Sequence, residues 1–541
     1  MSNFILKRNR LLHTAGFVFL LVGMSVLARG KPLDFTEMHT LDIPPGNSIG
    51  DMAFGSDSTL WIAAGGGIAK SEDFGETWTV FRHDMTENFP RGSASALQVN
   101  GDTVWVATVF DSSVTEGDLS TGGGLGRSFD AGSTWTFIPQ PVDTTSYVDT
   151  MYVAYGDTSV LLSPPTTTPI LNVTYDLAFE DSIVWITSWG GGIRKSTDYG
   201  ATWQRIPTPM DNMDYLSPDN VPAGYSIKLR TDRSGAEVEN QKGFSVTLDG
   251  DDVWVGTSGG VNHSTDGGVT WRRYHYGNSG VSGNWILALR KQTTANNEYL
   301  WASTGQTFYQ GEISGISVYD YDTGQWRTAK AVRFANNFAV SPTTDAVYAA
   351  TDDGVFKTTD FGYSWESFGT IYDAETGEPV YGASGSRGML YAISALVSPS
   401  PGGERIWIGT TDGLAYTDNE YEWHVLRSFS PTSHIKEANF YAYPNPFSPS
   451  RHNQLEGDGY VRFQFDMMAP GTVTLQVYDF AMEKVANVAI NESKSEGYIS
   501  ISWNGKNLLG DIVVNGVYFC KIQINEYGRK RTHWTKLLVI D

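Results

Sequence analysis

An octet of the form S/T-x-D-x-G-x-T/S-W recurs along this chain and constrains its fold more than any other feature. It occurs five times, as SEDFGETW, SFDAGSTW, STDYGATW, STDGGVTW and TTDFGYSW, which end at Trp78, Trp135, Trp203, Trp271 and Trp365. Two degenerate copies, VYDYDTGQW and YTDNEYEW, end at Trp326 and Trp423. Self-similarity of this kind indicates that one supersecondary unit has been copied along the chain.

An aromatic-aliphatic segment that runs into glycine precedes the octets. In one unit VWVGTSGGV starts at Val253, and a shorter apolar run at residues 244–248 lies ahead of it. With the octet and the segment after it, each unit predicts four strands with period-2 patterning and no helix. Seven such units predict an all-β chain whose main domain, residues 31–432, is a seven-bladed β-propeller.

The octet has a structural explanation. Its aspartates can accept hydrogen bonds from the backbone N–H groups of the hairpin that follows, as in an Asx-turn, and its glycines supply positive φ. The aspartates are Asp73, Asp130, Asp198, Asp266 and Asp360, and the glycines are Gly75, Gly132, Gly200, Gly268 and Gly362. We expect the tryptophan to open the outer strand and to pack between neighbouring sheets. A metal or catalytic role is disfavoured because a site is normally unique, whereas these carboxylates recur in nearly every unit.

Over residues 45–430, the octets and strand signatures resemble the Asp-box (BNR-repeat) propellers. That group includes sialidases, xyloglucanase-type glycoside hydrolases, sortilin-like receptors and photosystem-assembly propellers. The resemblance implies that the Asp-box turn joins the third and fourth strands of a blade, on the face opposite any ligand. The ligand face is then formed by the loops between second and third strands and by the connections between blades.

Three of these connections, at about 137–172, 205–240 and 367–388, are long enough to suggest function. The candidate ligand-face residues are the extra aromatic Trp189, the loop aromatics Phe110, Phe308 and Tyr309, and the arginines Arg91, Arg333 and Arg387. Aromatic side chains can stack on sugar rings, and converging arginines would suit a carboxylate ligand. The alternatives stay open: Trp189 could cap a blade edge or the central channel, and the arginines could be ordinary surface residues.

The N-terminus has the pattern of a signal peptide. Lys7, Arg8 and Arg10 precede an apolar stretch at residues 11–27, and Ala-Arg-Gly follows it. This order predicts a cleavable signal peptide over residues 1–30, with a membrane anchor as the alternative. We expect no transmembrane segment after cleavage.

Alternating strands and turn residues predict an Ig-like β-sandwich over residues 435–541. The motifs Y-P-N-P-F, W-N-G-K-N and N-G-V-Y-F in this region resemble the FlgD-type Ig-like fold and the C-terminal sorting domains of type IX secretion cargo. The resemblance implies passage through the periplasm of a Gram-negative-type bacterium to the cell surface or beyond, with the secretion machinery as partner. A plain adhesive or spacer module is the alternative.

Charge and motif content narrow the function. The net charge of −22 disfavours a surface that binds nucleic acid. The single cysteine, Cys520, is predicted to be a small buried residue. The sequence has no metal-ligand spacing, nucleophile elbow or phosphate loop, so we expect no metal and no cofactor. The main prediction is an exported, non-catalytic propeller that binds a glycan or a surface protein. The alternative is a secreted glycoside hydrolase, sialidase-like or xyloglucanase-like.

Overall fold

The structure is a computed structural model that describes most of residues 40–540. It leaves out residues 42–43, 56–58, 65, 115–116, 144–150, 163–164, 228–238, 308–309, 376, 378, 381–391, 428–439, 444, 450–459, 468 and 495–496. The predicted signal peptide and the predicted boundary at residues 432–435 both lie outside the described residues. Within the described part, the helices are two 3₁₀ turns, η1 (Pro218–Asn220) and η2 (Glu239–Gln241), and no helix is long and apolar enough to cross a membrane.

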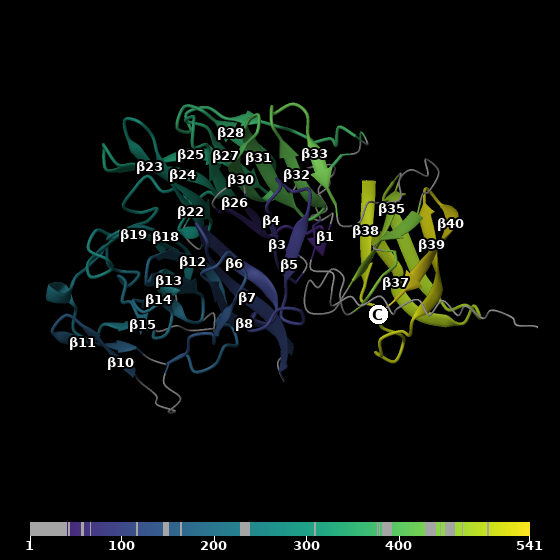
Figure 1. Ribbon diagram of the computed structural model, residues 1–541, viewed down its shortest axis with the longest axis horizontal. Coiled ribbons are helices and arrows are strands. Elements are labelled where there is room, and N and C mark those ends of the chain that lie inside the picture. The colour runs from purple at the N-terminus through teal and green to yellow at the C-terminus, as the bar shows by residue number, and fades with distance from the viewer. Residues whose placement is uncertain are drawn as a thin grey trace, which may run out of the picture. The chain divides into compact units, whose positions relative to one another are not determined.

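Seven antiparallel sheets, the blades, form the larger part of the described chain (Figure 1). From inner to outer strand, the first four blades are β2 (Asp51–Phe54), β3 (Leu60–Ala64), β4 (Gly67–Ser71), β5 (Trp78–Phe81); β6 (Ser93–Asn100), β7 (Thr103–Val114), β8 (Gly117–Ser128), β9 (Thr136–Ile138); β12 (Thr174–Glu180), β13 (Ile183–Ser188), β14 (Gly192–Ser196), β15 (Gln204–Arg205); and β18 (Gly243–Asp249), β19 (Asp252–Thr257), β20 (Gly260–Ser264), β21 (Trp271–Tyr274). The last three are β22 (Trp285–Thr293), β23 (Glu298–Gly305), β24 (Gly315–Asp320), β25 (Gln325–Ala331); β26 (Ala335–Val340), β27 (Val347–Thr351), β28 (Gly354–Thr358), β29 (Glu366–Ser367); and β30 (Ala392–Ser400), β31 (Gly403–Thr410), β32 (Gly413–Thr417), β33 (His424–Leu426).

The seven inner strands close a ring. Each inner strand contacts the inner strand of the next blade, from β2 through β6, β12, β18, β22 and β26 to β30, and β30 contacts β2 again. At the closure, the N–H of Ile49 donates to the carbonyl of Thr410 at 2.9 Å, and the N–H of Gly413 donates to the carbonyl of Asn47 at 2.8 Å. The prediction of a seven-bladed β-propeller is therefore confirmed.

The octet turns bind their own backbone as an Asx-turn does. In the first blade the N–H of Thr77 donates to Oδ1 of Asp73 at 2.8 Å, and Nε1 of Trp78 donates to the carbonyl of Gly75 at 3.1 Å. The backbone N–H contact with the aspartate recurs at Asp130, Asp198, Asp266 and Asp360, and the octet glycines all have φ between 82° and 95°. The ring of Trp78 is fully buried among residues of the first and last blades, so each turn also fastens neighbouring sheets.

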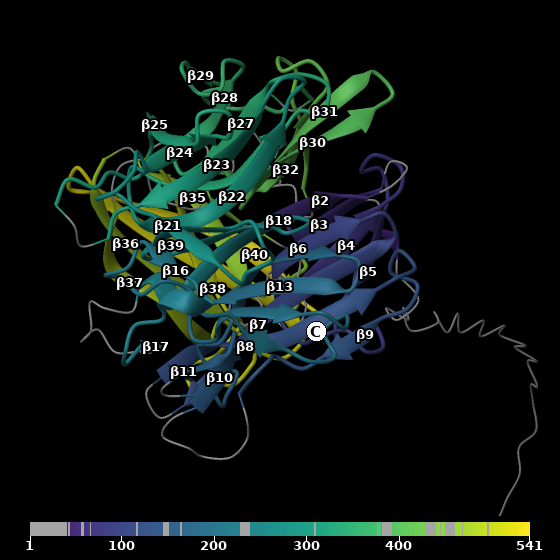
Figure 2. The ribbon, with the colours of Figure 1, turned by 90° about the vertical axis from the view of Figure 1, so that its left-hand side faces the viewer.

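Short strands occupy the long connections between blades. β10 (Met151–Tyr155) and β11 (Thr158–Leu162) form a hairpin before the third blade, and β17 (Ser226–Ile227) adds to it in parallel, as Figure 2 shows. Two further strands extend blades: β1 (Thr40–Leu41) pairs with β5, and β16 (Tyr215–Leu216) pairs with β21.

The C-terminal part is a β-sandwich, which confirms the predicted fold of that region. One sheet is β34 (Phe440–Tyr443), β35 (Val461–Met467) and β38 (Gly497–Trp503), and the other is, in spatial order, β37 (Lys484–Lys494), β36 (Gly471–Tyr478), β39 (Gly516–Glu526) and β40 (Arg529–Val539). Alternate residues of β36 and β39 are buried between the sheets. Cys520 is fully buried among them, and this burial raises the pKa of its thiol.

Candidate functional site

The face of the ring opposite the octet turns carries most of the sequence-predicted residues. In each blade the chain reaches this face between its second and third strands and again on its way to the next blade. Phe308, Tyr309 and Arg387 belong to this set but lie outside the described residues. Arg91, Phe110, Trp189 and Arg333 are described and lie on this face.

The two described arginines belong to different local contacts. The guanidinium carbon of Arg91 lies 4.6 Å from the ring centroid of Phe110 on β7. Arg333 lies between the fifth and sixth blades, where its Nε is 3.3 Å from Oδ2 of Asp352 and its N–H donates to Asp353 at 2.8 Å. No contact in the described part joins these arginines, so nothing brings them together as a shared carboxylate site.

Trp189 lies in the turn between β13 and β14, beside a chain of charged residues. Nζ of Lys242 is 5.6 Å from the Trp189 ring centroid and 2.6 Å from Oε1 of Glu239. Oε2 of Glu239 accepts a hydrogen bond from the hydroxyl of Ser258 at 2.7 Å. Both carboxylate oxygens of Glu239 therefore face donors.

Asp211 lies next to Glu239 in a more buried position. Its two carboxylate oxygens accept hydrogen bonds from the N–H groups of Glu239 and Asn240 at 2.8 and 2.7 Å. Burial raises the pKa of Asp211, the nearby charge of Glu239 adds to that rise, and the two N–H groups and Arg273 oppose it. Burial therefore favours the protonated form of Asp211, the form that a general acid requires.

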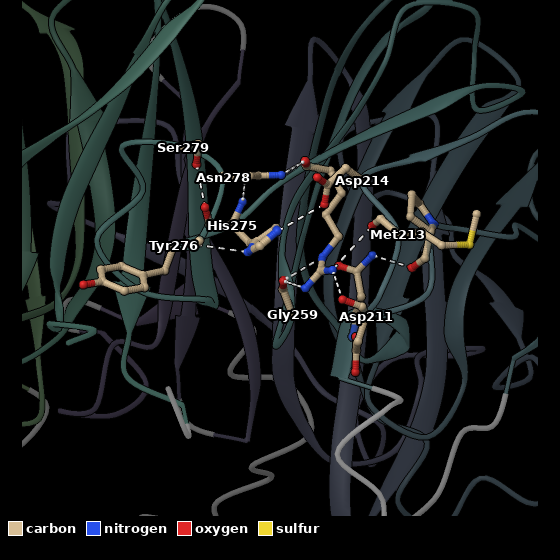
Figure 3. Close-up of polar contacts among 12 residues, drawn as sticks. Asp211, Met213, Asp214, Gly259, His275, Tyr276, Asn278 and Ser279 are labelled. Carbon is tan, nitrogen blue, oxygen red and sulfur yellow. Dashed lines mark hydrogen bonds and ion pairs between the residues drawn. The ribbon is translucent and has the colours of Figure 1, made fainter. Parts of the chain in front are cut away.

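Arg273, within β21, and His275, directly after it, make hydrogen bonds to this loop. Figure 3 shows His275 beside Asp214. The guanidinium of Arg273 is fully buried and donates to the carbonyls of Gly259 and Asp211. Nε2 of His275 lies 3.1 Å from Oδ1 of Asp214, and burial together with Arg273 lowers the pKa of the imidazole. The connection that carries Asp211 is thus fixed by hydrogen bonds from the next blade.

An aromatic arc runs along the inner rim of the same face. It consists of Tyr175, Phe244, Trp285 and Phe334, which stand at the start of four successive inner strands or just before one. Successive ring centroids are 5.3, 5.7 and 6.3 Å apart. The Tyr175 side chain is 39% exposed and the other three are half-buried. Partly exposed rings in such a row can stack on sugar rings and bury apolar CH faces.

Two further carboxylates belong to the inner strands. Oδ2 of Asp51 accepts from the N–H of Leu97 at 3.1 Å, and Oδ2 of Asp176 accepts from the N–H of Val246 at 2.9 Å. Burial raises the pKa of Asp51 to about 6 and that of Asp176 to about 7, and Arg290 lowers both. Each carboxylate links one inner strand to the next.

Sequence reasoning located this region but not its acids. The length of the connection at residues 205–240 predicted a function for this region. Asp211 and Glu239 were not predicted, because they stand in no sequence motif. The aromatic arc had a readable signal, an aromatic residue near the start of successive inner strands. Among the described residues, no group of three histidine, cysteine or acidic side chains is placed to hold a metal ion.

Known proteins resemble this chain over part of its length, although no family model matches it. It is 26% identical over 251 residues to a xyloglucanase of Hypocrea jecorina (strain QM6a), across 45% of this chain and 27% of that protein. It is 27% identical over 166 residues to a xyloglucanase of a Paenibacillus species, across 29% of this chain and 15% of that protein. The chain thus spans less than a third of the length of either relative.

Among solved structures, the GH74 enzyme of Niastella koreensis superposes with a TM-score of 0.47 at 13% identity, covering 92% of this chain and 74% of that one. The comparisons correct the main functional prediction. Both sequence relatives are named xyloglucanases, so the prediction of a non-catalytic binding propeller is wrong and the alternative, a glycoside hydrolase, is favoured.

Proposed function

We propose that this protein is an exported glycoside hydrolase that cleaves β-glucan chains of the xyloglucan type. The observation that carries the proposal is the 26% identity over 251 residues to a protein named xyloglucanase. The aromatic arc supports it, because a row of partly exposed rings suits an extended glycan more than a single small ligand.

We assign the acid role to Asp211 and the carboxylate role to Glu239. Protonated Asp211 would give its proton to the glycosidic oxygen as the bond to the anomeric carbon breaks. The Glu239 carboxylate would either take a proton from the attacking water or attack the anomeric carbon itself, and water would complete the hydrolysis. The anomeric configuration of the first product, measured by NMR, distinguishes these two routes.

The test is hydrolysis of a polysaccharide by the full-length mature protein. We expect it to release reducing ends from xyloglucan and none from a sialylated oligosaccharide. Loss of a general acid or base costs about 10²–10⁴ in rate, so Asp211→Asn and Glu239→Gln should each lower kcat by that factor. Asp219→Asn is the matched control, because Asp219 is an exposed carboxylate in the same connection.

Two outcomes would count against the proposal in different ways. If the wild-type protein releases no reducing ends from any β-glucan, the proposed activity is wrong. If it does and both variants retain full activity, the activity stands and the residue assignment fails.

The proposed export route depends on residues 1–30 and residues 435–541. We propose that residues 1–30 are a signal peptide and that the sandwich at residues 435–541 is an FlgD-type, type IX sorting domain that delivers the enzyme to the surface or medium. Deletion of residues 435–541 should leave the propeller in the periplasm, as measured by fractionation of a secreting host. Unchanged release into the medium would refute the sorting role.

A further inference from the structure

A second buried charge cluster lies in the third blade, away from the Asp211 pair. Arg194 on β14 and Arg205 on β15 are cross-strand partners, and both guanidinium groups bind the single carboxylate of Asp143 at 2.9 Å. The side chains are buried almost completely, with 4%, 2% and 1% of Arg194, Arg205 and Asp143 exposed. Asp143 belongs to the connection that leads into this blade.

Thr166 is the fourth member of this cluster. Asp143 also accepts a hydrogen bond from the N–H of Thr166 at 2.7 Å. The Thr166 hydroxyl accepts from Arg205 at 2.7 Å and donates to the carbonyl of Gly190 at 2.5 Å. Three donors remain, Nε of Arg194 and both Nε and Nη1 of Arg205, and they meet no acceptor in the described part of the chain.

The charge of the cluster does not balance either. Two guanidinium cations and one carboxylate leave a net charge of +1 on side chains that are almost completely buried. An uncompensated buried charge costs several kcal/mol, and arginine does not give up its proton in proteins. Burial and the neighbouring Arg194 lower the pKa of Arg205 to about 9, and Asp143 opposes this shift.

We propose that Arg194 and Arg205 bind one small monovalent anion, of the size and charge of chloride, through free N–H groups of both guanidiniums. One negative charge neutralises the cluster, and these N–H groups supply hydrogen bonds that a desolvated anion requires. The near-complete burial excludes a sugar or an organic carboxylate. The inference is independent of the proposed hydrolase activity.

The bound anion would stabilise one segment of the ligand face. Arg205, Thr166 and Gly190 form a continuous hydrogen-bonded path, and Gly190 follows Trp189 in the same turn. Neutralising the cluster therefore stabilises the connection at Asp143 and the turn that presents Trp189. This site is a structural ion site and not a substrate site.

The test uses the full-length mature protein at constant ionic strength, with sodium chloride replaced stepwise by sodium gluconate, an anion too large for the site. We expect the melting temperature to rise with chloride and to saturate, by about 2–4 °C in total. Arg205→Met removes the surplus charge and should abolish the chloride dependence. Arg333→Met, which removes an exposed arginine of the same face, should leave it intact.

Bromide provides a measurement that needs no variant. In crystals grown from sodium bromide, an anomalous peak should lie within hydrogen-bond distance of Nη1 of Arg205. The proposal is overturned if wild-type melting is the same in chloride and gluconate, if Arg205→Met retains the full shift, or if the position holds water alone.

Discussion

The octet aspartates set how the protein responds to acid. Hydrogen bonds from Ser364 lower the pKa of Asp360 to about 2, and those from Thr202 do the same for Asp198. A carboxyl group whose pKa is lower in the folded state stabilises the fold above its unfolded pKa, which is about 4, and this stabilisation is lost as the pH falls toward 2.

We expect the melting temperature of the wild-type protein to fall between pH 4.5 and pH 2.5, and Asp360→Asn to fall less steeply. Asn cannot be protonated in this range, so the variant lacks this part of the acid sensitivity. Asp322→Asn, in the exposed β24–β25 turn, is the control and should follow the wild type. Equal slopes for wild type and Asp360→Asn would refute the explanation.

Asp176 should show the opposite dependence. Burial raises its pKa to about 7, so its contribution to stability is fully present below pH 4 and is lost as the pH rises through 7. The stability of Asp176→Asn relative to the wild type should therefore increase from pH 5 to pH 8. Thermal melts of both proteins at each pH measure this, and parallel curves would contradict the raised pKa.

At the scale of the element, the turn between the third and fourth strands depends on one close contact. A Cβ added to Gly268 would lie 2.4 Å from the Trp185 ring of the preceding blade. Gly268 also has φ of +93°, which favours glycine. The same turn thus combines a backbone requirement with a packing requirement.

A matched pair of variants separates the two requirements. Gly250 has φ of +59° and open space around its Cβ position, so Gly250→Ala should cost only the backbone strain of about 1–2 kcal/mol. Gly268→Ala adds overpacking of about 1–3 kcal/mol. Denaturant unfolding at equilibrium measures both, and equal losses would show that the contact with Trp185 contributes nothing.

The elements also show what the sequence could predict. The strands and turns could be predicted because the octet repeats and because β19 and its counterparts share one aromatic-aliphatic pattern. These strands are buried nearly throughout. The acids were not readable, because Asp211 and Glu239 meet through hydrogen bonds between residues 28 apart, in a connection without periodicity. Arg194 and Arg205 look like surface residues in sequence, yet the preceding connection buries both.

At the scale of the whole molecule, the two parts have separate cores. One core cluster contains only residues of the C-terminal sandwich, including Leu475 and Val477, whereas the others link blades of the propeller. Because each part has its own hydrophobic cluster, the two parts can unfold independently.

Calorimetry should therefore resolve two unfolding transitions. Leu475→Ala removes a fully buried side chain and should lower one transition, by about 2–5 kcal/mol in stability. Ile408→Ala, in the core between the last two blades, should lower only the other. A single transition that moves with both variants would show that the parts unfold as one unit.

The closure of the ring has a consequence for how such a chain can change over generations. The last blade takes all four of its strands from its own segment, and it meets the first blade through packing and a few hydrogen bonds around Ile49 and Asn47. In the described part of the chain, no sheet is shared between the two ends of the ring. Duplication or loss of a whole blade therefore needs no new strand pairing, and the old ends could be joined and new ones opened between any two blades.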